Sequence, residues 1–224
     1  MTIQFGLVGS DGVAIVGDTL HYDSSAGTRT AFKSSKIRRN SQGTIAVAWS
    51  GKGNGLLVSK AITQEMADGC EIPQLEIEKI ADRVWESLTF DGESDLIVAM
   101  RTPSPQLFRV HLGNAGASIN NIHDKVVSGD GPNIAAYFVE RYYQRRPIAE
   151  LAAIAAHSVF LAQKFNSGGI GGLEIVLCRD DGFSSMSMAV VPDIEAEIDH
   201  FDRSLEITLL AHVEKFRYSP DVIG

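Results

Sequence analysis

The chain has 224 residues, a net charge of −8 and 44% apolar residues, a composition typical of a globular protein with a sizeable core. It contains 20 Lys and Arg against 28 Asp and Glu, and a net acidic chain is a poor candidate for general nucleic-acid binding, which needs a cationic surface. The charge is uneven, because residues 24–64 contain basic residues and no acid. We therefore expect no nucleic-acid partner and a local use for positive charge in the first third.

The cysteines and the apolar runs indicate the compartment. Cys70 and Cys178 are too few for a disulfide framework, and Cys178 lies in an apolar run typical of a buried strand. No segment approaches the roughly 18 consecutive apolar residues that span a bilayer, and the first residues lack the basic start of a signal peptide. The sequence predicts a cytoplasmic protein that does not enter a membrane.

The first quarter of the chain predicts two β-hairpins. Residues 3–8 and 13–17 alternate around a Ser-Asp-Gly turn, which is typical of a hairpin. Residues 18–29 carry no periodic signal and are expected to form a loop. A second hairpin is expected from residues 32–39 and 44–50, with the turn at the intervening Asn-Ser-Gln-Gly.

The middle of the chain predicts two helices and a third hairpin. Residues 56–68 and 74–89 have helical spacing, and the second range carries an apolar stripe made of Leu75, Ile80, Val84 and Leu88. Residues 95–100 and 107–112 are expected to pair across a turn that contains two prolines.

The last part of the chain repeats the order of hairpins and paired helices. The expected elements are a strand at 125–128, helices at 132–144 and 147–165, strands at 173–178 and 183–190, and a partly helical amphipathic tail from Ile194. No linker or internal repeat divides the chain, so residues 1–224 are expected to form a single domain. Paired helices and largely antiparallel sheets predict an α+β fold in layers.

Three familiar kinds of chemical site are absent from the sequence. The histidines are scattered, without the spacing of a metal site, and no Gly-x-Ser-x-Gly elbow is present. The glycine clusters at 51–55 and 167–172 fail both the dinucleotide fingerprint and the phosphate-loop pattern. The sequence therefore predicts no metal and no cofactor.

The start of the chain offers a different chemistry. Thr2 follows the initiator Met1, and a small second residue favours removal of that methionine. Removal would leave a hydroxyl and a free α-amine on one residue. An α-amine titrates at about pH 7.7–8.0, so near neutrality part of it is neutral and can serve as a general base. A threonine activated by its own amine is an established nucleophile.

Several short motifs, taken in order, resemble the proteasome β-type subunits and more closely the bacterial HslV-like peptidases. They are Thr-Ile at 2–3, DGVAIVGD at 11–18, KIRR at 36–39, IAVAWSG at 45–51, GDGP at 129–132 and SGG at 167–169. Each motif is only moderately specific, and their joint order and spacing carry the resemblance, which extends over about 190 residues by the order of elements. It implies an N-terminal nucleophile hydrolase with a four-layer αββα sandwich, in which two antiparallel sheets lie between helix layers.

The resemblance also implies roles for individual residues. Thr2 would attack the scissile carbonyl, Asp18 would orient Lys36, and the Lys36 cation would favour loss of the nucleophile's proton. The Gly51 N–H would stabilise the oxyanion, an effect worth about 3–4 kcal/mol for a single donor. Lys33 is an alternative to Lys36, although Lys36 aligns to Gly51 without a gap. Ser167 matches a site serine of the family.

Two departures and one pocket residue modify this expectation. Asp130 stands where the family has a serine near the nucleophile, and Lys164 falls roughly where an aspartate supports that serine. The two residues have either exchanged charge and kept a polar link, or Asp130 holds the α-amine protonated and weakens it as a base. Trp49 occupies the position that lines the substrate pocket, which predicts a shallow pocket for small P1 residues or a non-peptide amide.

The leading hypothesis is a threonine-type peptidase that works in a ring or other homo-oligomer on peptide or unfolded protein, with an ATP-dependent unfoldase as an expected partner. One alternative is an inactive scaffold subunit of the same fold, in which Asp130 and Lys164 mark the loss of activity. Another is an amidase for small substrates that uses the same nucleophile.

Overall fold

The computed structural model describes residues 2–23, 30–51, 54–66, 69–88, 92–129, 134–166, 168–186 and 191–217. Its contacts divide the chain into two compact units, Met1–Met186 and Ser187–Gly224, and each is described by itself. The expectation of a single domain over residues 1–224 stays a prediction.

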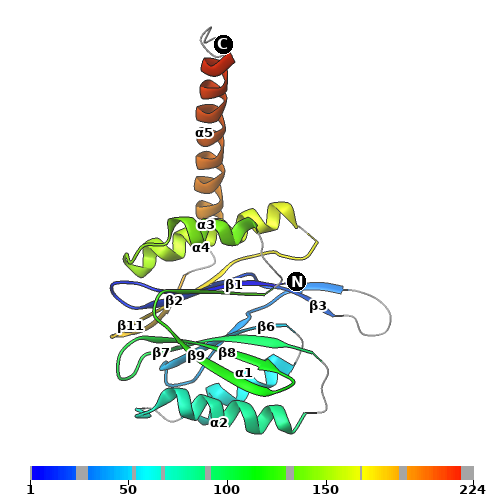
Figure 1. The fold of residues 1–224 in the computed structure, drawn as a ribbon, viewed down its shortest axis with the longest axis vertical. Coiled ribbons are helices and arrows are strands. Elements are labelled where there is room, and N and C mark those ends of the chain that lie inside the picture. The colour runs from blue at the N-terminus through cyan, green and yellow to red at the C-terminus, as the bar shows by residue number, and fades with distance from the viewer. Residues whose placement is uncertain are drawn as a thin grey trace, which may run out of the picture. The chain divides into compact units, whose positions relative to one another are not determined.

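The first sheet of the larger unit carries the start of the chain at its interior (Figure 1). Its strand order is β10-β1-β2-β11-β12, and all neighbours are antiparallel. The strands are β1 (Ile3–Val8), β2 (Val13–Gly17), β10 (Lys125–Gly129), β11 (Glu174–Arg179) and β12 (Gly182–Ser185). The predicted opening hairpin is confirmed, and β1 lies between β2 and β10, so a residue just before β1 has a strand on each side.

The second sheet has the order β5-β6-β7-β8-β9 and is also antiparallel. Its strands are β5 (Ile37–Arg39), β6 (Ile45–Gly51), β7 (Ser94–Met100), β8 (Gln106–Gly113) and β9 (Gly116–Ile122). The predicted strands at 44–50, 95–100 and 107–112 are confirmed. Strand β9 was not predicted, because Ile119 is its only buried hydrophobic residue and the asparagines around it obscure the alternation.

Helices cover the outer faces of both sheets. Helices α1 (Asn54–Glu65) and α2 (Pro73–Glu86) pack on the second sheet, α4 (Ile148–Phe165) packs on β1, β2 and β11 of the first, and α3 (Ile134–Tyr142) packs on α4. The four helices were predicted with boundaries within a few residues. The order of layers is helices, sheet, sheet, helices (Figure 1), so the expected α+β four-layer αββα sandwich is confirmed.

Apolar cores hold these layers together. Among the described residues, one core lies between the second sheet and α1 and α2, and another lies between the two sheets. Along β6 the side chains alternate between them, because Ile45 and Val47 face the helices while Ala46 and Ala48 face the first sheet. Small residues on the inner face allow the two sheets to pack closely.

The buried face of α2 differs from the predicted stripe. Ile80 is buried as expected, but Leu75 is 44% exposed, and the residues that face the sheet are Ile77, Ile80, Ala81 and Trp85. The Trp85 indole donates a hydrogen bond to the Gly113 carbonyl, which draws this face of the helix onto the sheet. Val84 is partly buried and packs against the same core, so the predicted stripe is right at Ile80 and Val84 and wrong at Leu75.

Helix α4 is, within the described ranges, the one helix long and apolar enough to cross a membrane. More than half of it is buried, and that face packs on the first sheet, which is how a core helix of this composition behaves. The expectation that the chain does not enter a membrane stays a prediction.

Two expectations between residues 18 and 39 were wrong. Part of the expected loop forms β3 (Leu20–Asp23), which pairs with β4 (Thr30–Lys33) in a separate two-stranded sheet. The strand expected over 32–39 is divided into β4 and β5 by an irregular segment at 34–36. The Ser34 N–H in this segment donates to the Thr19 carbonyl, so the chain leaves one sheet before it enters the next.

The smaller unit contains α5 (Val191–Arg217), which confirms a helix in the tail. Phe201, Leu205 and Ile207 are exposed on it. The strand expected over 183–190 is shorter, since β12 ends at Ser185, and residues 187–190 lie outside the described part of the chain.

Candidate functional site

The Asp18 carboxylate lies just beyond the end of β2 and is fully buried. Its Oδ1 accepts a hydrogen bond from the Ile3 N–H at 3.0 Å, and its Oδ2 accepts one from the Leu20 N–H at 3.1 Å. The Asp18 N–H in turn donates to the Ile3 carbonyl at 3.2 Å. The carboxylate is therefore held in place by backbone on both sides, immediately beside the first residue of β1.

The Lys36 side chain reaches this carboxylate from the irregular segment between β4 and β5. Its Nζ donates to Asp18 Oδ2 at 2.8 Å, and the lysine is only 3% exposed. The Glu174 carboxylate fixes the backbone there, because it accepts from Ser35 Oγ at 2.7 Å and from the Lys36 N–H at 3.1 Å. The break in the predicted strand thus directs Lys36 inward.

Thr2 meets the same lysine. Lys36 Nζ donates to Thr2 Oγ1 at 3.0 Å, so Thr2, Lys36 and Asp18 form one continuous hydrogen-bonded chain. Lys33, the alternative, lies on β4 and is exposed. The catalytic roles of these residues stay predictions, but their geometry permits a cation to act on the hydroxyl oxygen while a buried carboxylate holds that cation.

Gly51 ends β6, opposite Ser94 of β7, with φ of 95°. A Cβ at this position would lie 2.6 Å from the Glu93 carbonyl oxygen, so both the backbone conformation and the space demand glycine. The backbone N–H of Gly51 is a hydrogen-bond donor at the end of β6, next to the Trp49 and Ser50 backbone. The geometry is compatible with an oxyanion donor, and that role stays a prediction.

The remaining predicted residues lie partly outside the described chain. Asp130 and Ser167 are among the residues that the structure does not describe. Gly129 directly precedes Asp130 and pairs with Ile3, and a Cβ on it would come within 1.9 Å of the Thr2 carbonyl oxygen. Lys164 is exposed in the last turn of α4. The expected exchange of charge between Asp130 and Lys164 stays a prediction.

Trp49 belongs to an aromatic cluster beside the lysine. The His21 ring stacks on Phe32 with centroids 5.3 Å apart and lies 5.6 Å from the Trp49 ring. Burial, and next the positive charge of Lys36, lower the pKa of His21 below its usual value. The three rings form an uncharged wall near a cation, and the expected role of Trp49 in a substrate pocket stays a prediction.

Four polar residues close to these residues in the strands were given no role in the sequence analysis: Gln4, Ser50, Ser128 and Glu174. Three of them are buried polar residues in strands, and the fourth opens the apolar strand β11. The sequence signal was available, since a polar residue at an inward position of a strand needs a hydrogen-bond partner. The identity of that partner depends on which strands pack together and could not be read from spacing.

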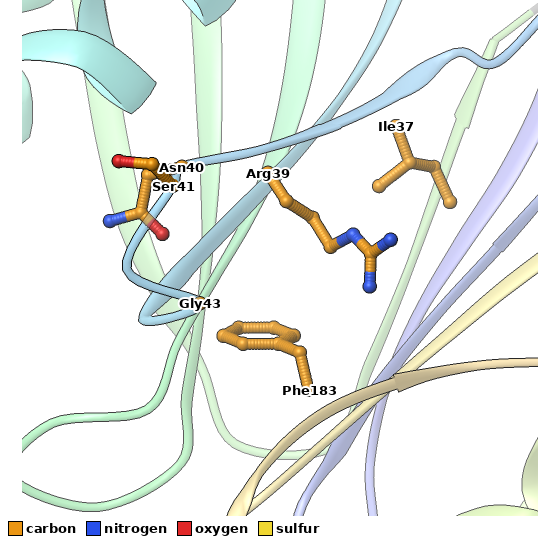
Figure 2. A pocket seen from close by; sticks show the side chains of 6 residues that line it. All are labelled: Ile37, Arg39, Asn40, Ser41, Gly43 and Phe183. Carbon is orange, nitrogen blue, oxygen red and sulfur yellow. The ribbon is translucent and has the colours of Figure 1, made fainter.

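A separate hollow of about 530 Å³ lies where the edge strands of the two sheets meet. Its lining residues are Ile37, Arg39, Asn40, Ser41, Gly43 and Phe183. Figure 2 shows the side chains of Arg39, from β5, and Phe183, from β12, extending toward this space. Thr2, Asp18 and Lys36 do not line this hollow, whereas Ile37, the residue after Lys36, does.

Comparison with known proteins finds structures that share the fold of this chain. No family model matches the chain, and no curated protein matches it. Among solved structures, Anbu from Yersinia bercovieri, described as an ancestral beta-subunit, matches with a TM-score of 0.67 at 12% identity over 99% of this chain and 100% of that chain. A Gly-1 mutant of Anbu from Hyphomicrobium sp. strain MC1 matches with a TM-score of 0.65 at 12% identity over 92% and 97%. The likeness is one of fold.

This result corrects the family expected from the sequence. A proteasome-like fold is shown, but identification of the chain as a proteasome β-type or HslV-like subunit was wrong, because only a distant relationship is supported at 12% identity. The motifs behind that identification are short turns and strand ends. Several contain glycines at positive φ, such as Gly51 and Gly129, which the backbone path of the fold demands whatever the family.

Proposed function

We propose that the chain is a threonine-type N-terminal nucleophile hydrolase that cleaves amide bonds after Met1 is removed. The observation that carries the proposal is the 3.0 Å contact between Lys36 Nζ and Thr2 Oγ1, with Asp18 behind the lysine at 2.8 Å. A buried lysine held by a carboxylate and aimed at a hydroxyl is the arrangement that an activated nucleophile requires. The proteasome-like fold supports the same reaction class.

The reaction follows from these groups. The α-amine of Thr2 accepts the hydroxyl proton, and Oγ1 forms a bond to the carbonyl carbon of the substrate while Lys36 stabilises the developing negative charge. The carbonyl electrons move to the oxygen, where the Gly51 N–H donates a hydrogen bond. The amine then transfers the proton to the leaving nitrogen as the C–N bond breaks. Water hydrolyses the ester that remains on Thr2, which restores the hydroxyl.

We further propose peptide or unfolded protein as substrate, a ring or other homo-oligomer as the working assembly, and an ATP-dependent unfoldase as partner. Small amides are the alternative substrate, and the aromatic wall of Trp49, His21 and Phe32 supports a preference for small, uncharged side chains next to the cleaved bond. Turnover of small chromogenic amides alongside an unfolded protein separates the two substrate classes. Sedimentation of the purified chain tests the assembly.

Mass spectrometry of the purified protein and of its Thr2→Ala variant tests the nucleophile. We expect wild-type protein that lacks Met1, hydrolyses an amide and gains mass at Thr2 with a threonine-directed electrophile. Thr2→Ala should lose hydrolysis and labelling, whereas Thr2→Ser, the matched control, should retain both because it keeps a hydroxyl and an amine. Retention of Met1, or hydrolysis that survives in Thr2→Ala, would contradict the proposal, and inert protein favours the scaffold alternative.

A further inference from the structure

The faces that the two sheets turn toward each other change from apolar to polar at the end nearest Thr2. On β6 the inward residues are Ala46, Ala48 and then Ser50, and on β10 they are Val126 and then Ser128. On β1 the corresponding residues are Gly6 and Gln4, and a Cβ on Gly6 would meet Ile97 and Leu107 of the second sheet. A period of two places Thr2 next on this same face.

The polar residues at this end join the two sheets directly. Ser50 Oγ and Ser128 Oγ lie 2.5 Å apart, and the two residues are 2% and 5% exposed. Ser50 Oγ also donates to the Asp95 carbonyl at 3.4 Å, so both hydroxyls are satisfied when Ser128 donates to Ser50. Gln4 Nε2 donates to the Trp49 carbonyl oxygen at 2.7 Å. The Ser50–Ser128 bond and the Gln4–Trp49 bond each join the sheet next to Thr2 to the strand that carries Gly51.

We infer that Gln4, Ser50 and Ser128 form an inter-sheet clamp that fixes the Thr2 hydroxyl relative to the Gly51 N–H. Apolar contacts resist separation of two sheets but allow them to slide, because the hydrophobic effect has no direction. Hydrogen bonds between buried groups restrict both distance and orientation. Ser50 directly precedes Gly51, and Gln4 lies two residues after Thr2. A slide between the sheets at this point would change the distance between the Thr2 hydroxyl and the Gly51 N–H. This inference rests on the proposed function.

Gln4 shows that the clamp is not optimised for stability. Its Nε2 is paired, but its Oε1 is buried and has no hydrogen-bond partner among the residues that the structure describes. A buried acceptor without a partner is unfavourable, and a methionine of similar size would avoid that cost. A residue kept for packing alone would therefore be apolar. These three are positioning residues, since none is placed against the reacting atoms.

The test uses the Ser50→Ala/Ser128→Ala double variant and Gln4→Met. Removing both serine hydroxyls together leaves neither of them facing an unpaired hydroxyl and takes from the Asp95 carbonyl only a long bond of 3.4 Å, so the double variant should fold with nearly unchanged stability. We expect kcat for an amide to fall by about 10–100-fold with KM unchanged. Without the clamp the two sheets can slide, and the Thr2 hydroxyl then shifts relative to the Gly51 N–H. Ser158→Ala is the matched control, since Ser158 is fully buried and its hydroxyl bonds within its own helix to the Ile154 carbonyl.

A peptide vinyl sulfone separates position from reactivity. Thr2 Oγ adds to its β-carbon and the proton from Oγ ends on its α-carbon, so no carbonyl oxyanion forms and Gly51 is not needed. The clamp predicts labelling within about twofold of wild type in both variants while amide hydrolysis falls. Hydrolysis within about twofold of the Ser158→Ala control would overturn the inference, and so would hydrolysis and labelling that fall in parallel.

Hydrogen–deuterium exchange decides the inference if the wild-type protein proves inert and the proposed function fails. Peptides that cover residues 45–51 should exchange faster in the double variant than in Ser158→Ala, because loss of the clamp loosens the end of β6. Exchange of these peptides at the control rate would overturn the clamp whatever the enzyme does.

Discussion

Lys36 Nζ lies 2.8 Å from Asp18 Oδ2, with the two side chains 3% and 0% exposed. An ion pair this deeply buried gains little net stability as a pair, because both charges have lost water, but it is costly to break. Asp18→Asn and Lys36→Met should each lower the free energy of unfolding by about 3–5 kcal/mol. The double variant should lose less than the sum of the two single changes, since neither charge is then left alone. Urea unfolding of the four proteins measures this coupling, and additive losses would contradict it.

The N-terminus of α4 is capped by a residue from the first hairpin. Asp11 Oδ1 accepts from the Ile148 N–H at 2.7 Å, and Oδ2 accepts from Arg179 Nε at 3.1 Å. The hydrogen bond from Ile148, together with Arg179, lowers the pKa of Asp11 below its usual value. Asp11→Ala should cost about 1 kcal/mol, as loss of a helix cap does. Asp181→Ala, in an exposed turn, is the control.

The Asp11 contribution also depends on pH. Because the folded pKa lies below the ordinary value of 3.8, the stabilisation is complete well above that pH and is lost as the pH falls through the folded pKa. The difference in stability between wild type and Asp11→Ala should therefore shrink as the pH falls below about 4. A difference that stays constant from pH 7 to pH 3 would show that the cap acts without its charge.

We expect His21 to give the stability a second dependence on pH. As for Asp11, stability should fall as the pH is lowered, but for His21 the fall should begin near pH 6.5. Burial and the Lys36 charge hold the pKa of His21 below the ordinary 6.5. Just below pH 6.5 the unfolded chain therefore binds a proton at His21 and the native chain does not. Stability should fall as the pH is lowered through 6.5 and stop falling below the native pKa. His21→Phe retains an aromatic ring against Phe32 and should show a shallower fall in melting temperature between pH 7.5 and 5.5 (about one ionisation less). An unchanged slope would contradict the shift.

The two cysteines should differ sharply in reactivity. Burial raises the pKa of Cys178 to about 12, so hardly any thiolate forms at pH 8, whereas Cys70 is partly exposed. A chromogenic disulfide reagent should titrate one thiol rapidly in the native protein and the second only in denaturant. Cys70→Ala should remove the rapid phase. A rapid phase that persists in Cys70→Ala would contradict the burial of Cys178.

The residues at the centre of the site were named by two different routes. Thr2 was named from its own position after an initiator methionine, whereas Asp18, Lys36 and Gly51 were named from the resemblance that short motifs carry. Lys36 contacts Thr2 and Lys33 is exposed, while the catalytic role of either lysine stays a prediction. The patterns did not settle the chemistry of these groups. Chains that share a fold also share its turns and strand ends, whether or not they have the same activity.

The supporting residues could not be predicted because their partners are distant in sequence. Ser50 bonds to Ser128 and Lys36 is fixed by Glu174, across separations that only the packing of two sheets determines. Strand β3 and the division of the expected strand into β4 and β5 were missed for a related reason, since a two-stranded sheet outside the cores shows no burial pattern in its sequence. The alternation of apolar and polar residues reveals strands that are buried on one face. All of β4 is exposed, and hydrogen bonds between the backbones of β3 and β4 hold the two strands together.

The anchoring of Ile3 limits where the residue before it can lie. Its N–H and carbonyl both bond to Asp18, and it pairs with Gly129 on the other side. The backbone next to Thr2 is therefore held on two sides, with the Thr2 hydroxyl 3.0 Å from Lys36 Nζ. The same Asp18 carboxylate accepts from the Ile3 N–H and from Lys36 Nζ. A substitution at Asp18 would therefore disturb the strand that leads to the hydroxyl and the cation beside it at the same time.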